Sequence, residues 1–225
     1  MVFEFINRIE AIQFMKKKGV LIVLSGFSGA GKGTIVKKLL NTYDNYALSI
    51  SMTTRNPRPG EENGREYFFV TKEEFERHIE KEELVEYAQY VGNYYGTPKA
   101  YVDEQLADGK DVILEIEIQG ALKIKERFPD TLLLFVTTKS AEVLKQRLTG
   151  RGTETEEVIN DRMARAIEEA KGMRQYEYII VNDDLDTCVK ETHAIIQSAK
   201  DASLRNEEFI KTIQQELKDL SKGEK

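Results

Sequence analysis

The chain has 225 residues, of which 40% are hydrophobic and 32% are charged, a balance typical of a soluble globular protein. Its net charge of −6 argues against non-specific nucleic-acid binding, because proteins of that kind usually carry a basic excess. The apolar N-terminal stretch is interrupted by charges, so it is neither a signal peptide nor a membrane span. The single cysteine, Cys188, cannot form an internal disulfide. We therefore expect a cytoplasmic protein with no membrane or nucleic-acid partner.

The N-terminal segment, residues 1–18, predicts a short helix. Its hydrophobic residues stand at helical spacing, namely Phe5, Ile6, Ile9 and Ile12. The lysines that end the segment, followed by Gly19, are typical of a helix terminus. We expect this helix to pack on the surface of the domain.

A glycine-rich turn follows the first predicted strand. The aliphatic run Val20–Ser25 is typical of a buried strand, and residues 34–40 predict a helix. Between them, Gly26–Lys32 fits the pattern G-x-x-x-x-G-K. In this pattern the backbone N–H groups point at a polyphosphate, and the positive end of the helix faces the same anion. Lys32 would reach the β- and γ-phosphates, and the alternative is an ordinary glycine turn.

The residue after Lys32 departs from the generic pattern. Gly33 stands where Ser or Thr usually supplies a hydroxyl ligand to Mg²⁺, and the nearest hydroxyl belongs to Thr34. The pattern alone therefore leaves the hydroxyl ligand of the metal undecided.

A small mixed β insertion is predicted over residues 51–97, after a strand over residues 46–51. Thr71 and Glu74 form a capping box that opens a helix, and Pro98 suits the first position of the next helix. The expected elements of the insertion are a strand over 67–70, a helix over 71–81 and a hairpin over 84–97.

Two arginines stand in a proline-bounded loop of this insertion. Arg55 and Arg58 are three residues apart, and two guanidinium groups in a stiff loop suit bidentate capture of a phosphate. A solvated arginine loop is the alternative interpretation.

Carboxylates end the second core strand, predicted over residues 111–117. Ligands gather at the carboxyl ends of parallel strands, so Glu115 and Glu117 suit an Mg²⁺ water shell or a substrate that donates hydrogen bonds. Polarity at a strand edge is the alternative. A third core strand is predicted over residues 131–136, and Ser140 is expected to cap the following helix.

A hinged lid is predicted where that helix ends. Glycines flank Arg151 within residues 147–154, and a charged helix that carries Arg162 follows. Arginines on such a segment can close over a phosphoryl group and stabilise its charge. For Arg162 the alternative is a solvated helix charge. The last core strand is predicted over residues 178–184, and a helix over residues 185–199.

The C-terminal stretch, residues 200–225, predicts an amphipathic helix and a polar tail. Its apolar stripe consists of Leu204, Ile210, Ile213, Leu217 and Leu220. We expect it to pack on the domain, with a contact in a homodimer as the alternative, so the sequence leaves a monomer and a homodimer open.

Taken together, the motifs resemble those of the guanylate kinase family over about residues 19–199. They are, in chain order, Gly26–Thr34, Ser51-x-x-x-Arg55-x-x-Arg58, Gly92–Gly96, Leu114–Glu117, Gly150–Glu154 and Val181–Asp184. The resemblance implies an α/β P-loop fold with three layers (α/β/α), a central parallel sheet, a small mixed β insertion that binds GMP, and a helical lid. The implied divisions are an N-terminal helix over 1–18, a core over 19–50 and 98–199 with its lid at about 140–170, the GMP-binding insertion over 51–97, and the C-terminal helix and tail over 200–225.

The resemblance also assigns the substrate side. The positions that match the phosphate site of GMP are Arg55, Arg58, Tyr67 and Tyr95, and those around guanine are Ser51, Glu86, Thr97 and Glu117. The chemistry of Glu86 agrees, because guanine presents two adjacent donors on its pairing edge and a carboxylate offers two acceptors.

On the other side, the resemblance implies ATP and Mg²⁺. The ATP loop comprises Gly26, Phe27, Ser28, Gly29, Ala30, Gly31, Lys32, Gly33 and Thr34, and adenine is read at Asn182. The catalytic cations are Lys32, Arg147, Arg151 and Arg162, and Thr34 and Glu115 lie near the metal, which is held through water. Family members carry Lys-Gly-Thr at this point, as here, whereas Phe27 stands where proline is more usual. We expect Phe27 to alter the stiffness of the loop and not the activity.

The implied reaction is transfer of the γ-phosphoryl group of Mg–ATP to GMP in purine nucleotide metabolism. The acceptor phosphate is already an anion near neutral pH, so no general base is needed. Two alternatives remain: a guanylate-kinase-like module that binds phosphorylated peptides without catalysis, and a kinase of another nucleoside monophosphate. Lys32, Ser51 and Arg151 favour the enzyme, and Glu86 and Ser51 favour guanine.

Overall fold

The computed structural model describes residues 18–90, 92–150 and 155–223. Residues 1–17, which make up most of the expected N-terminal helix, and Arg151 lie outside this range.

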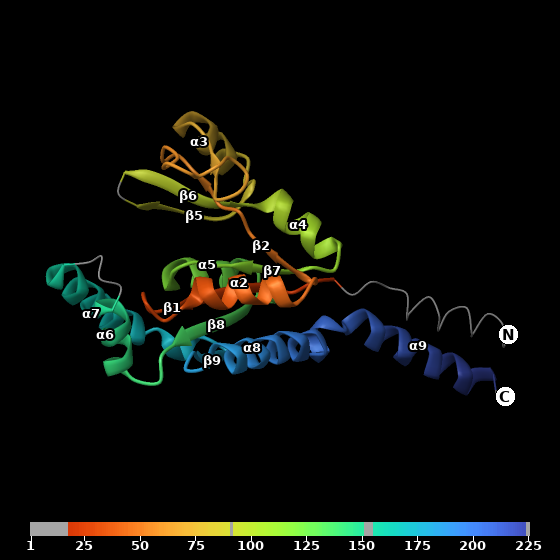
Figure 1. The fold of residues 1–225 in the computed structure, drawn as a ribbon. Helices are drawn as coiled ribbons and strands as arrows, with labels where there is room; N and C mark the ends of the chain where they lie inside the picture. The colour runs from red at the N-terminus through yellow and green to blue at the C-terminus, as the bar shows by residue number, and fades with distance from the viewer. Residues whose placement is uncertain (1–17, 91, 151–154, 224–225) are drawn as a thin grey trace.

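The centre of the fold is a parallel sheet of five strands in the order β2-β7-β1-β8-β9 (Figure 1). Its strands are β1 (Leu21–Gly26), β2 (Tyr46–Leu48), β7 (Asp111–Leu114), β8 (Leu132–Thr137) and β9 (Tyr178–Val181). Strands β1, β7 and β8 are aliphatic runs that are buried almost throughout, as expected for a sheet covered on both faces. The expectation of an α/β fold around a parallel sheet is confirmed.

Helices form the outer two layers. The chain leaves β1 toward β2 and leaves β7 toward β8 in opposite directions along the sheet, so right-handed crossovers put the connecting helices on opposite faces. Helix α2 (Lys32–Thr42) accordingly packs with α8 (Leu185–Lys200) on one face, and α4 (Lys99–Ala107) and α5 (Ile118–Arg127) cover the other.

A second, mixed sheet stands above the first in the view of Figure 1. Its order is β4-β3-β6-β5, with β3 and β4 parallel and the other pairs antiparallel. The strands are β3 (Met52–Thr53), β4 (Phe68–Phe69), β5 (Leu84–Tyr90) and β6 (Asn93–Pro98). Helix α3 (Lys72–Glu80) begins at the predicted capping box of Thr71 and Glu74 and buries Phe75 in a small core with Met52 and Leu84.

Several predicted strands are shorter in the structure. The strand expected over residues 46–51 ends at Leu48, and Ser51 lies in the link to β3 of the other sheet. The strands expected over 111–117 and 178–184 end at Leu114 and Val181 because Glu117 and Asp184 are N-caps of α5 and α8. An acidic side chain at such a position accepts hydrogen bonds from the first turn of the helix, which favours a cap over a longer strand.

Pro98 also differs from its prediction. It ends β6 and is the N-cap residue of α4, so the helix begins at Lys99 and not at Pro98 as expected. Ser140 caps α6 (Ala141–Thr149) as predicted, by accepting from the backbone N–H of Val143 at 3.2 Å. Helix α7 (Glu156–Ala170) follows, and a short 3₁₀ turn, η1 (Met173–Gln175), leads into β9.

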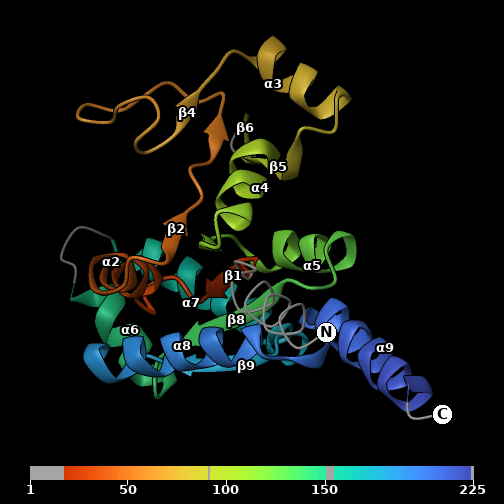
Figure 2. The ribbon, with the colours of Figure 1, turned by 90° about the vertical axis from the view of Figure 1, so that its right-hand side faces the viewer.

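The C-terminal helix α9 (Glu207–Gly223) follows the turn η2 (Ser203–Arg205) and points away from the rest of the structure in both views (Figures 1 and 2). The expectation that it packs on the domain is wrong for the described residues, since every member of the predicted stripe is exposed, namely Leu204, Ile210, Ile213, Leu217 and Leu220. An amphipathic pattern specifies a helix face but not the surface that covers it. None of the helices in the described ranges is long and apolar enough to cross a membrane.

Candidate nucleotide site

The shape of the phosphate loop is set by glycines with positive φ. Gly26, Gly29 and Gly31 have φ of 147°, 88° and 95°. A Cβ on Gly26 would lie 2.1 Å from the carbonyl oxygen of Val136, and one on Gly31 would lie 2.4 Å from Nδ2 of Asn182. Other residues are therefore excluded at both positions by backbone conformation and by contact.

Lys32 folds back over this loop. Its Nζ donates to the carbonyl oxygens of Gly26 at 2.8 Å and of Phe27 at 3.3 Å. Helix α2 begins at Lys32 with no side-chain cap and no acidic residue in its first turn. Its first N–H groups are therefore not occupied by a capping side chain, and together with the positive helix end they suit an anion.

A cavity of about 600 Å³ opens at this helix end. Its lining residues are Gly29, Gly31, Lys32, Gly33, Thr34, Lys37 and Glu115. Desolvation raises the pKa of the Glu115 carboxyl, and the charge of Lys32 acts in the opposite direction. A hydroxyl and a carboxylate on one cavity are the hard oxygen groups that suit Mg²⁺, which usually keeps several waters. Within the described ranges, no group of three or more His, Cys, Asp or Glu side chains is arranged to hold a metal.

Arginines from two helices reach the loop. Arg147 of α6 donates to the carbonyl oxygens of Asn182 at 2.8 Å and of Ala30 at 3.3 Å. Arg162 of α7 donates to Oγ of Ser28 at 2.5 Å. Both predicted lid arginines within the described ranges therefore contact the phosphate loop, Arg147 at Ala30 and Arg162 at Ser28.

Asn182 also contacts the phosphate loop. Its side chain is buried, and its Nδ2 donates to the carbonyl oxygen of Ala30 at 2.8 Å. The family resemblance implies that Asn182 reads adenine, whereas its side-chain contact in the structure is with Ala30 of the loop. Phe27 is likewise buried, and its ring packs edge-to-face on Phe135 at a centroid distance of 5.0 Å. This side chain anchors the loop in the core.

The predicted phosphate site of GMP forms an aromatic and cationic cluster in the small sheet. The guanidinium of Arg55 lies 5.3 Å from the ring centroid of Tyr67 and 5.7 Å from that of Phe69. The rings of Tyr67 and Tyr95 meet edge-to-face at 6.1 Å. Arg55 also pairs with Glu61, which is the main cause of its raised pKa.

Arg58 has an exposed side chain, and its backbone N–H donates to Oε2 of Glu61 at 2.8 Å. The structure thus brings Arg55 and the main chain of Arg58 to one carboxylate. Sequence reasoning missed Glu61, although an acidic residue three positions after Arg58 in the same turn was a usable signal.

The predicted guanine site contains a half-buried carboxylate, Glu86, beside the buried Thr97. Oε1 of Glu86 accepts from the hydroxyl of Thr97 at 2.8 Å, and burial raises the pKa of Glu86. Glu117 lies close to Glu86, and both carboxylates border Gly120. A Cβ added to Gly120 would lie 3.7 Å from Oε1 of Glu117 and 3.9 Å from Oε2 of Glu86. Ser51 is half-buried in the link before β3.

Glu117 has a second role that the sequence did not indicate. Its carboxylate accepts from the backbone N–H groups of Gln119 at 3.1 Å and of Gly120 at 2.9 Å, at the start of α5. The other end of α5 is joined to the small sheet, since Arg127 donates to the carbonyl oxygen of Leu84 at 2.9 Å. Helix α5 therefore links the two sheets.

Electrostatic effects connect the two ends of the candidate site. The positive charge of Lys32 favours lower pKa values for Glu115 and Glu169. The negative charge of Glu117 favours higher pKa values for Glu86 and Glu169. Desolvation is the largest cause of the raised pKa of Glu169, which lies on α7. Sequence reasoning missed Glu169, whose position in a charged helix gives no signal.

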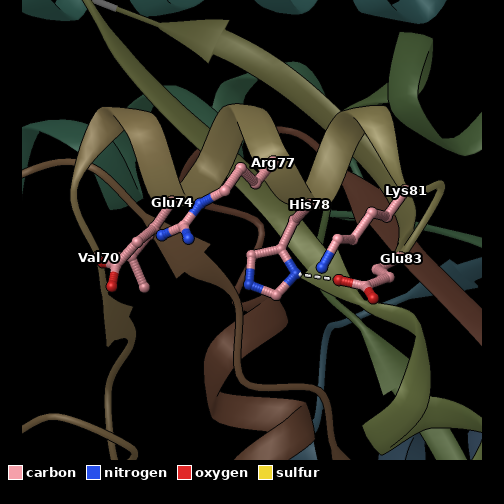
Figure 3. Close-up of a pocket in the computed structure, with 6 residues that line it drawn as sticks. All are labelled: Val70, Glu74, Arg77, His78, Lys81 and Glu83. Carbon is pink, nitrogen blue, oxygen red and sulfur yellow. Dashed lines mark hydrogen bonds and ion pairs between the residues drawn. The ribbon is translucent and has the colours of Figure 1, made fainter.

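A second, smaller hollow of about 240 Å³ lies beside α3 (Figure 3). Its walls carry charges of both signs, from Glu74, Arg77, His78, Lys81 and Glu83, with Val70 at one side. His78 and Glu83 are hydrogen-bonded to each other at 2.7 Å. No predicted site residue lines this hollow.

A parallel sheet whose first strand runs through a glycine loop into an uncapped helix defines the class of P-loop nucleotide-binding proteins. Comparison with known proteins narrows the class. The family model described as guanylate kinase matches residues 18–199. The chain belongs to the guanylate kinase family.

Its curated relatives are similar over nearly their full length. The guanylate kinase of Halalkalibacterium halodurans is 54% identical over 80% of this chain and 89% of its own. That of Clostridioides difficile is 53% identical over 86% of this chain and 95% of its own. The crystal structure of guanylate kinase from Anaplasma phagocytophilum superposes with a TM-score of 0.66 at 31% identity, covering 84% of this chain and 90% of that one.

Proposed function

We propose that the protein is a guanylate kinase that transfers the γ-phosphoryl group of ATP to GMP, giving ADP and GDP. Two features carry this proposal: a phosphate loop closed by Lys32, and a hydrogen-bonded Glu86–Thr97 pair. Thr97 lies on β6, the strand that also carries Tyr95 of the Arg55 cluster. Membership of the family supports the assignment.

Guanine selection follows from the half-buried carboxylate of Glu86. N1–H and the N2 amino group of guanine are adjacent donors, and ionised Glu86 accepts from both. Thr97 fixes one oxygen of that carboxylate by donating to it at 2.8 Å. Adenine would place a lone pair against the carboxylate, and a buried polar group left unpaired costs about 1–3 kcal/mol.

Phosphoryl transfer needs positioning and positive charge. A phosphate oxygen of GMP attacks the γ-phosphorus in line, the bond to the β–γ bridging oxygen breaks, and ADP leaves with that oxygen. Lys32, Arg147 and Arg162 offset the charge that spreads over the transferred group, and Arg151 is proposed to join them. Arg55, Arg58, Tyr67 and Tyr95 hold the acceptor phosphate.

The residues of the loop cavity fit Mg–ATP. Gly26 to Thr34 would hold its phosphates, with Asn182 proposed near adenine. When bound, Mg²⁺ neutralises charge on the β- and γ-phosphates, and Thr34 and Glu115 would hold it through water. Lys37 lines the same cavity and adds positive charge.

A coupled assay of ADP release tests the proposal across GMP, AMP, CMP and UMP. We expect turnover with GMP and Mg–ATP that exceeds that of the other three by orders of magnitude. Equal turnover of any other nucleoside monophosphate would overturn the guanine assignment. Binding of GMP with no ADP release would favour the non-catalytic module.

The same proposal places the protein in purine nucleotide metabolism in the cytoplasm. The single cysteine, Cys188, is buried and free, which suits a reducing compartment.

A further inference from the structure

Glu61 connects the two arginines of the turn over residues 55–61. Nη2 of Arg55 donates to Oε1 of Glu61 at 3.0 Å and to Oε2 at 2.9 Å. Oε2 also accepts from the backbone N–H of Arg58 at 2.8 Å. One carboxylate therefore joins the side chain of the first arginine to the main chain of the second.

The turn and its ion pair are partly shielded from water. The side chains of Arg55 and Glu61 are 15% and 18% exposed. The backbone N–H of Glu61 donates to the carbonyl oxygen of Arg58 at 3.0 Å, and Gly60 supplies the positive φ of 88° that the turn requires. The N–H of Arg58 is the largest cause of the lowered pKa of Glu61, so the carboxylate is ionised at neutral pH.

The guanidinium of Arg55 is held on its other edges as well. Nη1 donates to the carbonyl oxygen of Asn56 at 2.7 Å, and the plane lies near the rings of Tyr67 and Phe69. A long side chain with several rotamers is thereby restricted before any ligand arrives. Restricting a binding group in advance lowers the entropy cost of binding.

We propose that Glu61 is a positioning residue for the phosphate of GMP, which it serves by fixing the fork of Arg55 and the backbone at Arg58. The inference rests on the proposed function, because the phosphate is that of the proposed substrate. A carboxylate near a phosphate also repels it. The two roles predict opposite effects of removing the charge: loss of order weakens GMP binding, and loss of repulsion strengthens it.

The variant Glu61→Gln separates these roles, since it keeps the size of the side chain and loses the charge and one acceptor. We expect KM for GMP to rise at least about tenfold, with kcat at saturating GMP and KM for ATP within about twofold of wild type. Glu66→Gln is the matched control. Glu66 accepts from Nε of Arg65 at 2.6 Å and from the backbone N–H of Glu62 at 2.8 Å, which is the same chemistry on an arginine that is not a predicted GMP ligand. Its KM for GMP should be unchanged.

Guanosine distinguishes a role at the phosphate from general damage to the site, because it carries the base but no phosphate. As an inhibitor that competes with GMP, it should have the same inhibition constant in wild type and Glu61→Gln. Equal weakening of guanosine and GMP would overturn the inference, and so would an unchanged or lower KM for GMP. Calorimetric binding of GMP by both proteins distinguishes this failure from that of the proposed function: a wild type that binds GMP without transferring phosphate refutes the activity and still tests Glu61.

Discussion

The phosphate loop and the small mixed sheet are built in different ways. The loop is shaped by backbone packing, as Gly26 shows by its approach to the carbonyl oxygen of Val136 on the neighbouring strand β8. In the small sheet, β3 and β4 have two residues each, and the recognition groups are held by side-chain contacts. Arg55 with Glu61 and Thr97 with Glu86 are the main examples.

The difference separates two kinds of failure. Changes in the loop alter the packing of the central sheet, so we expect stability and activity to be lost together. The exception is a change that removes only the charge at the end of a side chain. Changes in the small sheet remove side-chain contacts that lie outside the core of the central sheet, and we expect them to affect GMP recognition while the central sheet persists.

The sharpest test on the loop side is Lys32→Met. We expect kcat to fall on the order of 10³-fold, because a cation aimed at the transferred group is lost. Thermal unfolding should change little, since the side chain is only half-buried. Lys37→Met is the matched control, because Lys37 lines the same cavity outside the loop. An equal loss of kcat in both variants would show that net charge, and not the loop lysine, matters.

A pair of glycine substitutions compares the two regions in stability. Gly26→Ala combines a positive φ with a Cβ 2.1 Å from a backbone oxygen, so we expect a loss of about 3 kcal/mol. Gly60→Ala also has a positive φ, but nothing lies within 4 Å of the added Cβ, so about 1 kcal/mol is expected. Urea denaturation measures both. Equal losses would contradict the claim that packing shapes the loop.

On the small-sheet side, Glu86→Gln tests the half-buried carboxylate. One acceptor becomes a donor that faces the donors of guanine, so kcat/KM for GMP should fall about 10²-fold. KM for ATP should stay within about twofold, because the loop contacts are unaffected. Parallel losses for GMP and ATP would place Glu86 outside the guanine site.

The smallest effect concerns pH and stability. Burial raises the pKa of Glu86 above 4.5, the hydrogen bond from Thr97 opposes this, and the charge of Glu117 adds to it. The folded protein then holds the proton more tightly than the unfolded chain does, so stability falls as pH rises from 4.5 through the raised pKa. Glu86→Gln cannot ionise, and we expect it to be more stable than wild type at neutral pH without nucleotide. A wild type that is equally stable across this window would contradict the prediction.

The sequence predicted the core and the loop better than the details of the small sheet. Aliphatic runs and the spacing of Gly26, Gly31 and Lys32 identify a buried strand and its turn, because backbone geometry demands those residue types. The insertion was predicted to begin at residue 51, but the end of β2 at Leu48 and the two-residue strand β3 were not predicted. The residue pattern alone does not show where pairing with a neighbouring strand stops.

Side-chain pairing was the second limit. Glu117 was predicted near guanine, and its bonds to the start of α5 emerge only when the strand end is known. Asn182 was predicted at adenine, and its contact with Ala30 depends on two segments far apart in the sequence. Polar residues near strand ends indicate a site, whereas the partner of each one depends on tertiary geometry.

The small core of the mixed sheet, which consists of Met52, Phe75 and Leu84, limits what can be done with this region as a separate piece. A two-stranded or short-stranded unit with so little apolar burial does not persist alone in water. The proposed guanine site also uses Glu117, the N-cap residue of α5, and Arg127 of the same helix donates a hydrogen bond to β5. A guanine-binding fragment excised at residues 51–97 would lose its shape, and a transplant to another scaffold would need α5 to travel with it.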